Sequence, residues 1–173
     1  MTGAEKYEKV QSLVAAGQVA TPEVTRDSFE VTPGRTVFIN GGTNYDWAKL
    51  VLLSGDWPVT DSSVTVITRW MRQENYIDTW WNRNNPLNNG WGSGGNSGLG
   101  SYPSLTVAAE NAAEALNTHQ GYSDIRAALA SSASAEVTER AIWASPWASS
   151  HYANGSIWHY TPVPVVKAPP GAW

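Results

Sequence analysis

Cysteine is absent from this chain of 173 residues, and its absence removes several kinds of chemistry at once. Disulfides, thiolate-bound metals and cysteine nucleophiles are all excluded. The three histidines, at positions 119, 151 and 159, lack the spacing of metal ligands, and no thiolate could complete a zinc site. No G-x-S-x-G segment marks a serine hydrolase. We therefore expect neither a metal nor any other cofactor.

Positive charge is also scarce, because 11 Lys and Arg stand against 15 Asp and Glu and leave a net charge of −4. The basic residues are scattered along the chain, which argues against binding to nucleic acid. Long apolar runs are missing too. No segment has the length of a membrane span, and the first residues lack the apolar core of a signal peptide.

Tryptophan and tyrosine are abundant instead, with ten Trp and seven Tyr against two Phe. Both side chains combine a flat apolar face with a polar group, which suits contact with partly polar ligands such as sugars. Any single Trp can equally fill the core. Between Trp80 and Trp91, however, the neighbouring residues are Asn, Arg and Gly, so we expect these rings to be exposed.

Apolar periodicity predicts a mostly α protein, most clearly over residues 44–152. The segment "DWAKLVLLSG" indicates a buried helix that ends at Gly55, and Thr60 or Asp61 is the expected N-cap of the next helix. Three later helices are expected at Leu105–Thr118, Asp124–Ala130 and Glu136–Trp143. Their expected N-caps are Ser104, Ser123 and Ser134.

The two ends of the chain have a different pattern. Residues 4–16 indicate a short helix, and residues 18–43 an extended connector in which "SFEV" and "RTVFIN" resemble short strands. The prolines of "PVPVVKAPPGAW" exclude a helix. We therefore divide the chain into an N-terminal helix and extended arm (1–43), a helical domain (44–152) and an extended C-terminal tail (153–173).

One carboxylate continues the apolar face of a predicted helix. Ile67, Met71 and Glu74 follow one another at spacings of four and three, so they share a face. Glu74 should then lie at the edge of the core, where partial burial raises the pKa of a carboxylate. A raised pKa is what a general acid needs at neutral pH. The alternative is a Glu74 that reaches solvent or pairs with Arg69 or Arg72.

The segment that follows this carboxylate is suited to binding a saccharide. Trp80, Trp81 and Trp91 can supply flat rings, whereas Asn85 and Asn88 can supply amides for hydroxyl and N-acetyl groups. Asn and Gly also favour the left-handed backbone of turns. The Asn-rich stretch can therefore be a turn, a binding surface or both.

The order of several short motifs resembles a known family. "WMRQEN", "NNPLNN", "GLGSYPSL", "AAENAAEAL", "YSDIRAAL" and "AIWASPW" follow one another as in the small lysozyme-like domains of actinobacteriophage lysins and tail-associated wall-degrading proteins. The resemblance covers about residues 44–152. It implies a lysozyme-like helical domain of the goose-type lysozyme and lytic transglycosylase kind, which cleaves the glycan strands of peptidoglycan.

The resemblance also implies roles for individual residues. Glu74 would be the catalytic acid, the turn from Asn85 to Asn88 would face the substrate, and Tyr102 would be the tyrosine of the cleft. Glu74 would protonate the leaving oxygen and then activate either water or the 6-hydroxyl of the sugar itself. The sequence leaves hydrolysis and transglycosylation equally open. Asp78 is the nearest second carboxylate, but a single-Glu mechanism does not need it.

The chain also departs from that pattern at two points. The link "NYIDTWWNR" after Glu74 is longer than usual, and Asn89-Gly90 replaces the Thr-Thr that commonly follows the turn. These differences favour an alternative, in which a structural phage virion protein keeps the lysozyme-like fold and binds glycan or a partner without cutting. A plain carbohydrate-binding module is a third possibility, which the helical pattern disfavours.

The arm and the tail exceed a minimal lysin, so we expect them to contact other virion proteins. The protein would then be tail-associated in the phage virion, or else released from the host cytoplasm to the cell wall, with peptidoglycan as its main partner.

Overall fold

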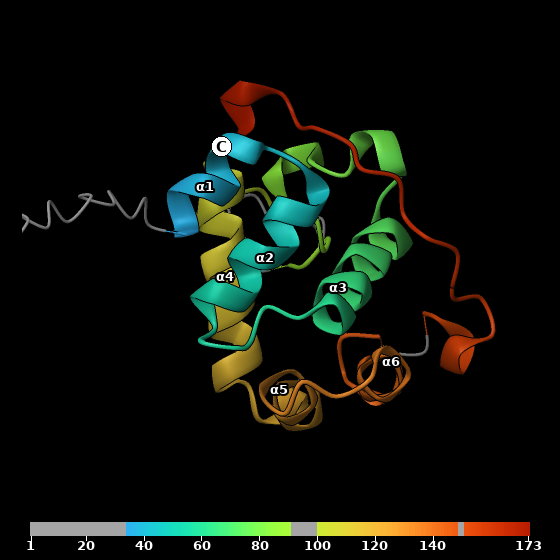
Figure 1. Cartoon of the computed structure of the whole chain (residues 1–173). Coiled ribbons are helices and arrows are strands. Elements are labelled where there is room, and N and C mark those ends of the chain that lie inside the picture. The colour runs from blue at the N-terminus through green and yellow to red at the C-terminus, as the bar shows by residue number, and fades with distance from the viewer. Residues whose placement is uncertain (1–33, 91–99, 149–150) are drawn as a thin grey trace, which may run out of the picture. The chain divides into compact units, whose positions relative to one another are not determined.

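The computed structural model describes residues 34–90, 100–148 and 151–173, which form helices joined by turns and contain no strand (Figure 1). The mostly α fold expected from the sequence is confirmed. The predicted helix at 4–16, the "SFEV" segment and Trp91 lie outside the described residues. So does the glycine-rich stretch 92–99.

The helices expected within residues 44–148 are present, and the bounds predicted for them lie within two residues of those in the structure. They are α2 (Asn44–Ser54), α3 (Asp61–Glu74), α4 (Leu105–Thr118), α5 (Ser123–Ala130) and α6 (Ala135–Ala144). The side chains of Thr60, Ser104 and Ser134 accept hydrogen bonds from backbone N–H groups of the first turns, as N-caps do. Short 3-10 turns follow α3 at Ile77–Thr79 and Asn82–Asn84.

Two local predictions are wrong. "RTVFIN" is part of helix α1 (Gly34–Gly41) and not a strand. The β-branched residues favour a strand only weakly, and packing overrides that preference, because Ile39 lies against the core. Ser123 is the first residue of α5 and not its cap. The 3-10 turn Gln120–Tyr122 runs directly into that helix, so Tyr122 takes the cap position, although its side chain does not cap the helix.

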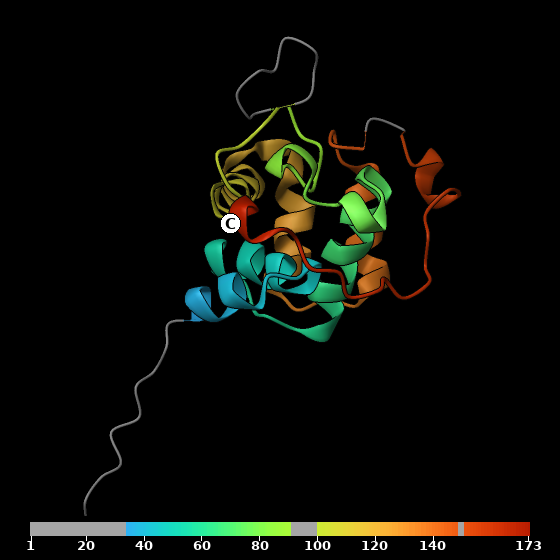
Figure 2. The same cartoon turned by 90° about the horizontal axis from the view of Figure 1, so that it is seen from above.

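The core is formed where α2 packs against α4 and α3, and where α6 packs against α3 and α5 (Figures 1 and 2). Three tryptophans, Trp47, Trp70 and Trp80, are among its largest fully buried side chains. The indole N–H of Trp47 donates to the carbonyl of Leu105 over 2.9 Å, which ties α2 to the start of α4. Trp70 projects from α3 and packs edge-on against Trp147.

The segment after α6 crosses the surface and returns to the start of α2 (Figure 1). Its backbone accepts hydrogen bonds from side chains of the body. Asn44 donates to Pro164 over 2.9 Å, Tyr45 donates to Val163 over 2.8 Å, and the Trp80 indole donates to Val166 over 3.1 Å. We call residues 156–169, which carry these contacts, the strap.

Residues 34–41 and 153–173 belong to the same compact unit as residues 44–152, within Thr32–Trp173. Two short 3-10 turns, Ala153–Gly155 and Pro170–Ala172, are the only helical elements described after residue 150. The division into arm, domain and tail stays a prediction. Among the helices described, none is both long enough and apolar enough to cross a membrane.

Candidate active site

Glu74 is the last residue of α3, at the edge of the core as its spacing predicts. Ile67 and Met71 on the same face are buried, and Glu74 itself is partly buried. The helix ends because Asn75 turns to an extended backbone, while its N–H still bonds to the carbonyl of Met71 over 2.8 Å. The carboxylate therefore lies at a fixed point where the helix stops.

A buried tyrosine holds the Glu74 carboxylate. The hydroxyl of Tyr152 donates a hydrogen bond to Oε1 of Glu74, and the indole N–H of Trp70 donates to the Tyr152 oxygen over 2.9 Å. Tyr152 is packed edge-on against Trp158. Since Trp70 already donates to the tyrosine oxygen, the tyrosine proton is directed at the carboxylate. This chain of two hydrogen bonds fixes the orientation of Glu74.

Burial raises the pKa of Glu74 above its usual value. The hydrogen bond from Tyr152 and the electrostatic influence of His151 act against this rise in pKa, but burial is the largest influence. Burial and the neighbouring Glu74 charge also raise the pKa of Tyr152, so the phenol keeps its proton and remains a donor. The arrangement favours a Glu74 that carries its proton to higher pH than a solvated carboxylate does.

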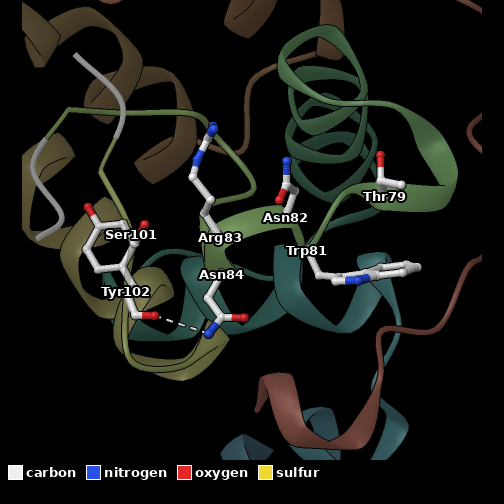
Figure 3. A pocket seen from close by; sticks show the side chains of 7 residues that line it. All are labelled: Thr79, Trp81, Asn82, Arg83, Asn84, Ser101 and Tyr102. Carbon is white, nitrogen blue, oxygen red and sulfur yellow. Dashed lines mark hydrogen bonds between the residues drawn. The ribbon is translucent and has the colours of Figure 1, made fainter. Parts of the chain in front are cut away.

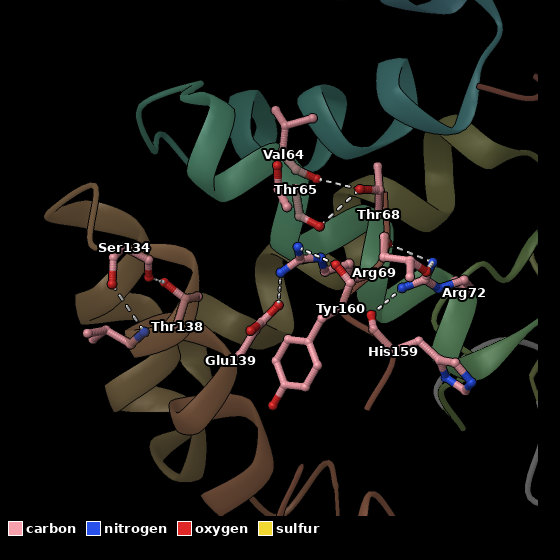
Figure 4. Close-up of polar contacts among 12 residues, drawn as sticks. Val64, Thr65, Thr68, Arg69, Arg72, Ser134, Thr138, Glu139, His159 and Tyr160 are labelled. Atoms are coloured by element: carbon pink, nitrogen blue, oxygen red, sulfur yellow. Dashed lines mark hydrogen bonds and ion pairs between the residues drawn. The ribbon is translucent and has the colours of Figure 1, made fainter. Parts of the chain in front are cut away.

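The alternative partners for Glu74 are engaged elsewhere. Arg69 pairs with the buried carboxylate of Glu139 over 2.8 Å, and Arg72 donates to the backbone carbonyl of His159 in the strap (Figure 4). Arg72 also donates to the backbone carbonyl of Thr161 over 2.9 Å. Among the described residues, Glu74 forms no ion pair. The hypothesis that either arginine neutralises Glu74 is therefore wrong.

The Asn-rich turn after α3 is built mostly by its own side chains. Asn85 is fully buried; its amide donates to the carbonyls of Asn89 and Gly100 over 2.8 and 2.9 Å. Asn88 donates to the backbone carbonyl of Glu74 over 2.9 Å, with its backbone at a left-handed φ of 51°. Asn85 therefore holds the turn and offers no amide to a substrate, whereas Asn88 joins the turn to Glu74.

A cavity of about 530 Å³ opens beside this turn (Figure 3). Two predicted site residues line it: Trp81, which is partly exposed, and Tyr102, whose hydroxyl donates to the side chain of Asn89. The described residues that line the cavity are Thr79, Trp81, Asn82, Arg83, Asn84, Ser101 and Tyr102. Its volume is typical of small-molecule sites. Glu74 is not one of the lining residues.

The expected exposure of Trp80 is wrong. Its side chain is 1% exposed, because the ring packs edge-on against Trp81 and Trp173 while its N–H is bonded to the strap. Apolar packing outweighs the polar sequence neighbourhood on which the prediction rested. Asp78 lies exposed on the 3-10 turn Ile77–Thr79.

Sequence reasoning missed Tyr152 and Arg83. Tyr152 lies 78 positions from Glu74, and no local pattern links the two residues. Arg83 had a detectable signal, because it is the one cation within the Asn-rich segment from Asn82 to Gly90.

Replacing Tyr152 with Phe should move the pH range in which Glu74 is protonated. The lost hydrogen bond stabilised the charged carboxylate, so the variant raises the pKa of Glu74 further. The pH titration of the Glu74 carboxyl, followed by NMR, should therefore shift to higher pH in Tyr152→Phe. A Tyr122→Phe variant removes a phenol that does not contact Glu74 and should leave this titration unchanged. A shift to lower pH in Tyr152→Phe would contradict the assignment.

Within the part of the chain that the structure describes, no group of three or more His, Asp or Glu side chains is placed so that it could bind a metal ion.

Comparisons with known proteins found no relative: no family model, no curated protein and no solved structure matches this chain.

Proposed function

We propose that this protein cleaves the glycan strands of bacterial peptidoglycan with Glu74 as its single catalytic acid. The observation that carries the proposal is the partly buried Glu74 carboxyl, which has a raised pKa, a tyrosine donor on Oε1 and no ion-pair partner among the described residues. A carboxyl group that keeps its proton to higher pH than a solvated one is suited to donate that proton to a glycosidic oxygen.

The chemistry of such a site follows from what surrounds Glu74. Its proton passes to the leaving oxygen as the glycosidic bond breaks, and the carboxylate that remains is stabilised by the Tyr152 hydroxyl. The same carboxylate then takes a proton from the attacking hydroxyl, either of water or of the 6-position of the sugar. Asn88 fixes the backbone of Glu74 during both steps.

The cavity beside the turn supports a saccharide ligand. It combines one indole face from Trp81 with amides and hydroxyls from neighbouring residues, and this mixture matches the apolar faces and polar edges of sugar rings. Asn88 links this cavity to the acid, because it accepts a hydrogen bond from Arg83, which lines the cavity, and donates one to the backbone carbonyl of Glu74. A glycan bound in the cavity would thus lie close to the end of α3.

Trp81→Ala should weaken binding of wall glycan about tenfold, because it removes the only indole among the described residues that line the cavity. Affinity is best measured by co-sedimentation with purified cell walls. Tyr76→Ala is the matched control, since Tyr76 is an aromatic residue 82% exposed that does not line the cavity. Equal losses in both variants would mean that the cavity does not hold the glycan.

The deciding experiment is clearing of a purified actinobacterial cell-wall suspension, with mass spectrometry of the soluble fragments. New reducing ends would indicate hydrolysis, whereas 1,6-anhydro ends would indicate the intramolecular route. A folded protein that neither clears the suspension nor releases glycan fragments would overturn the proposal.

We further propose that the protein is phage-encoded and acts as a tail-associated part of the virion or after release to the wall.

A structural virion protein that binds glycan without cutting is the second candidate. It is favoured by one observation, namely that Glu74 does not line the cavity that contains Trp81 and Tyr102. Wall binding that depends on Trp81, without any release of glycan fragments, would select this candidate over cleavage.

A further inference from the structure

We propose that the cavity beside the turn recognises a carboxylate on the muramyl units of the glycan, through Arg83. The inference deepens the proposed function and rests on it for the identity of the saccharide. Among the described residues that line the cavity, Arg83 is the only one that carries a full charge. The cavity is therefore positive in a protein whose net charge is −4, and it favours an acidic ligand over a neutral one.

The Arg83 guanidinium is not neutralised within the part of the chain that the structure describes. Arg35, Arg69 and Arg140 each pair with a glutamate, whereas Arg83 forms no ion pair. Its one hydrogen bond there runs from Nη2 to the side chain of Asn88, and its Nε is buried without a partner. A guanidinium has five N–H donors in a planar fork, so most of its capacity to bind a carboxylate is unused.

The left-handed backbone of Arg83 also supports a binding role for its side chain. Arg83 has a φ of 56° and Asn84 a φ of 49°, both in the left-handed region. Glycine or asparagine adopts this region more easily than a long side chain does, and such strain gathers at binding sites. The N–H of Tyr102 donates to the carbonyl of Arg83 over 3.1 Å, which holds Arg83 beside another residue that lines the cavity.

The position of Arg83 suits a sugar with an acidic substituent. In the view of Figure 3 the Arg83 side chain extends upward between Tyr102 and Asn82, whereas the Trp81 ring extends to the lower right. Because Arg83 and Trp81 line the same cavity, a glycan that fills it can contact both. In peptidoglycan every second sugar carries a lactyl ether, whose carboxylate is either free or extended by a peptide that has carboxylates of its own. Both sources present the same chemical group.

The test is a set of binding measurements by calorimetry on Glu74→Gln protein, which leaves the glycan uncut. The ligands are a tetrasaccharide with free lactyl carboxylates, its carboxamide, the same glycan carrying its stem peptide, and chitotetraose. We expect the free acid to bind about tenfold more tightly than the carboxamide and chitotetraose. Tight binding of the peptide-bearing glycan alone would place the carboxylate on the peptide.

Adding Arg83→Gln should abolish the preference for the acid and leave the affinity for chitotetraose unchanged. Arg126→Gln is the matched control, because it changes net charge equally and lies on α5, away from the cavity. The inference is overturned if Arg83→Gln keeps the preference, or if it weakens chitotetraose equally, which would make Arg83 a structural residue. No binding of any glycan also overturns it. A preference for acid in a protein that clears no cell walls would support the inference and contradict only the cleavage.

Discussion

Glu74→Gln should lower the rate of glycan release from cell walls by about 10²- to 10⁴-fold, the contribution usual for a positioned general acid. Glutamine keeps the size of the side chain and can still accept the hydrogen bond from Tyr152, but it has no proton to give. The loss should appear as slower clearing at equal protein concentration and equal wall binding. Glu114→Gln changes an exposed carboxylate on α4 and should have no effect.

The same substitution should not destabilise the protein at neutral pH. A carboxyl whose pKa is raised by folding holds its proton more tightly in the folded chain than in the unfolded one. Its contribution to stability is thus complete below the unfolded pKa and is lost as the pH rises through the folded pKa. The glutamine variant avoids this loss. Its thermal midpoint should equal or exceed that of wild type at pH 7, and the difference should shrink towards pH 4. A lower midpoint at pH 7 would show that the variant tests folding as well as catalysis.

The second large effect concerns two glutamates on α6 that both pair with arginine. Glu139 is 1% exposed and pairs with Arg69, whereas Glu136 is 68% exposed and pairs with Arg140. Glu139→Ala should lower the free energy of unfolding by about 3–5 kcal/mol, because it leaves the Arg69 charge largely buried without its partner. Glu136→Ala should cost less than about 1 kcal/mol, as expected of a solvated pair.

These two variants are closely matched, since both replace a glutamate of the same helix by alanine. Urea unfolding would give the difference in the free energy of unfolding directly, provided that the dependence of this free energy on urea concentration has the same slope in both variants. A loss in Glu139→Ala no greater than that in Glu136→Ala would show that Arg69 regains its solvation in the variant. Arg69 also donates to the Tyr160 carbonyl over 2.6 Å, so the loss should be accompanied by loosening of the strap (Figure 4).

Local signals account for what the sequence predicted well. The helices within residues 44–148 follow from apolar periodicity and from caps such as Thr60, Ser104 and Ser134, which act over three or four residues. Glu74 was found because its position depends on the same period. Ser123 was misassigned because a 3-10 turn replaced the free helix end that the cap was meant to serve.

Residues whose role depends on distant partners could not be predicted in this way. Trp80 has polar neighbours in sequence, yet it is buried by Trp173 and by the strap. Tyr152 reaches Glu74 only because the chain after α6 folds back towards the end of α3. The amides of Asn85 were expected to face a substrate, but the backbone of their own turn takes them. In each case the deciding contact forms only in the folded chain, and it produces no periodic pattern in the sequence.

The hydrogen bond between Tyr152 and Glu74 closes a loop of 78 residues, and the one between Trp80 and the strap closes a loop of 86. Contacts of such long range carry a large entropic cost of closure and form late in folding. Helix α3 can therefore exist before Glu74 has the surroundings that raise its pKa. The proton affinity of the acid is a property of the closed chain and not of the helix that carries it.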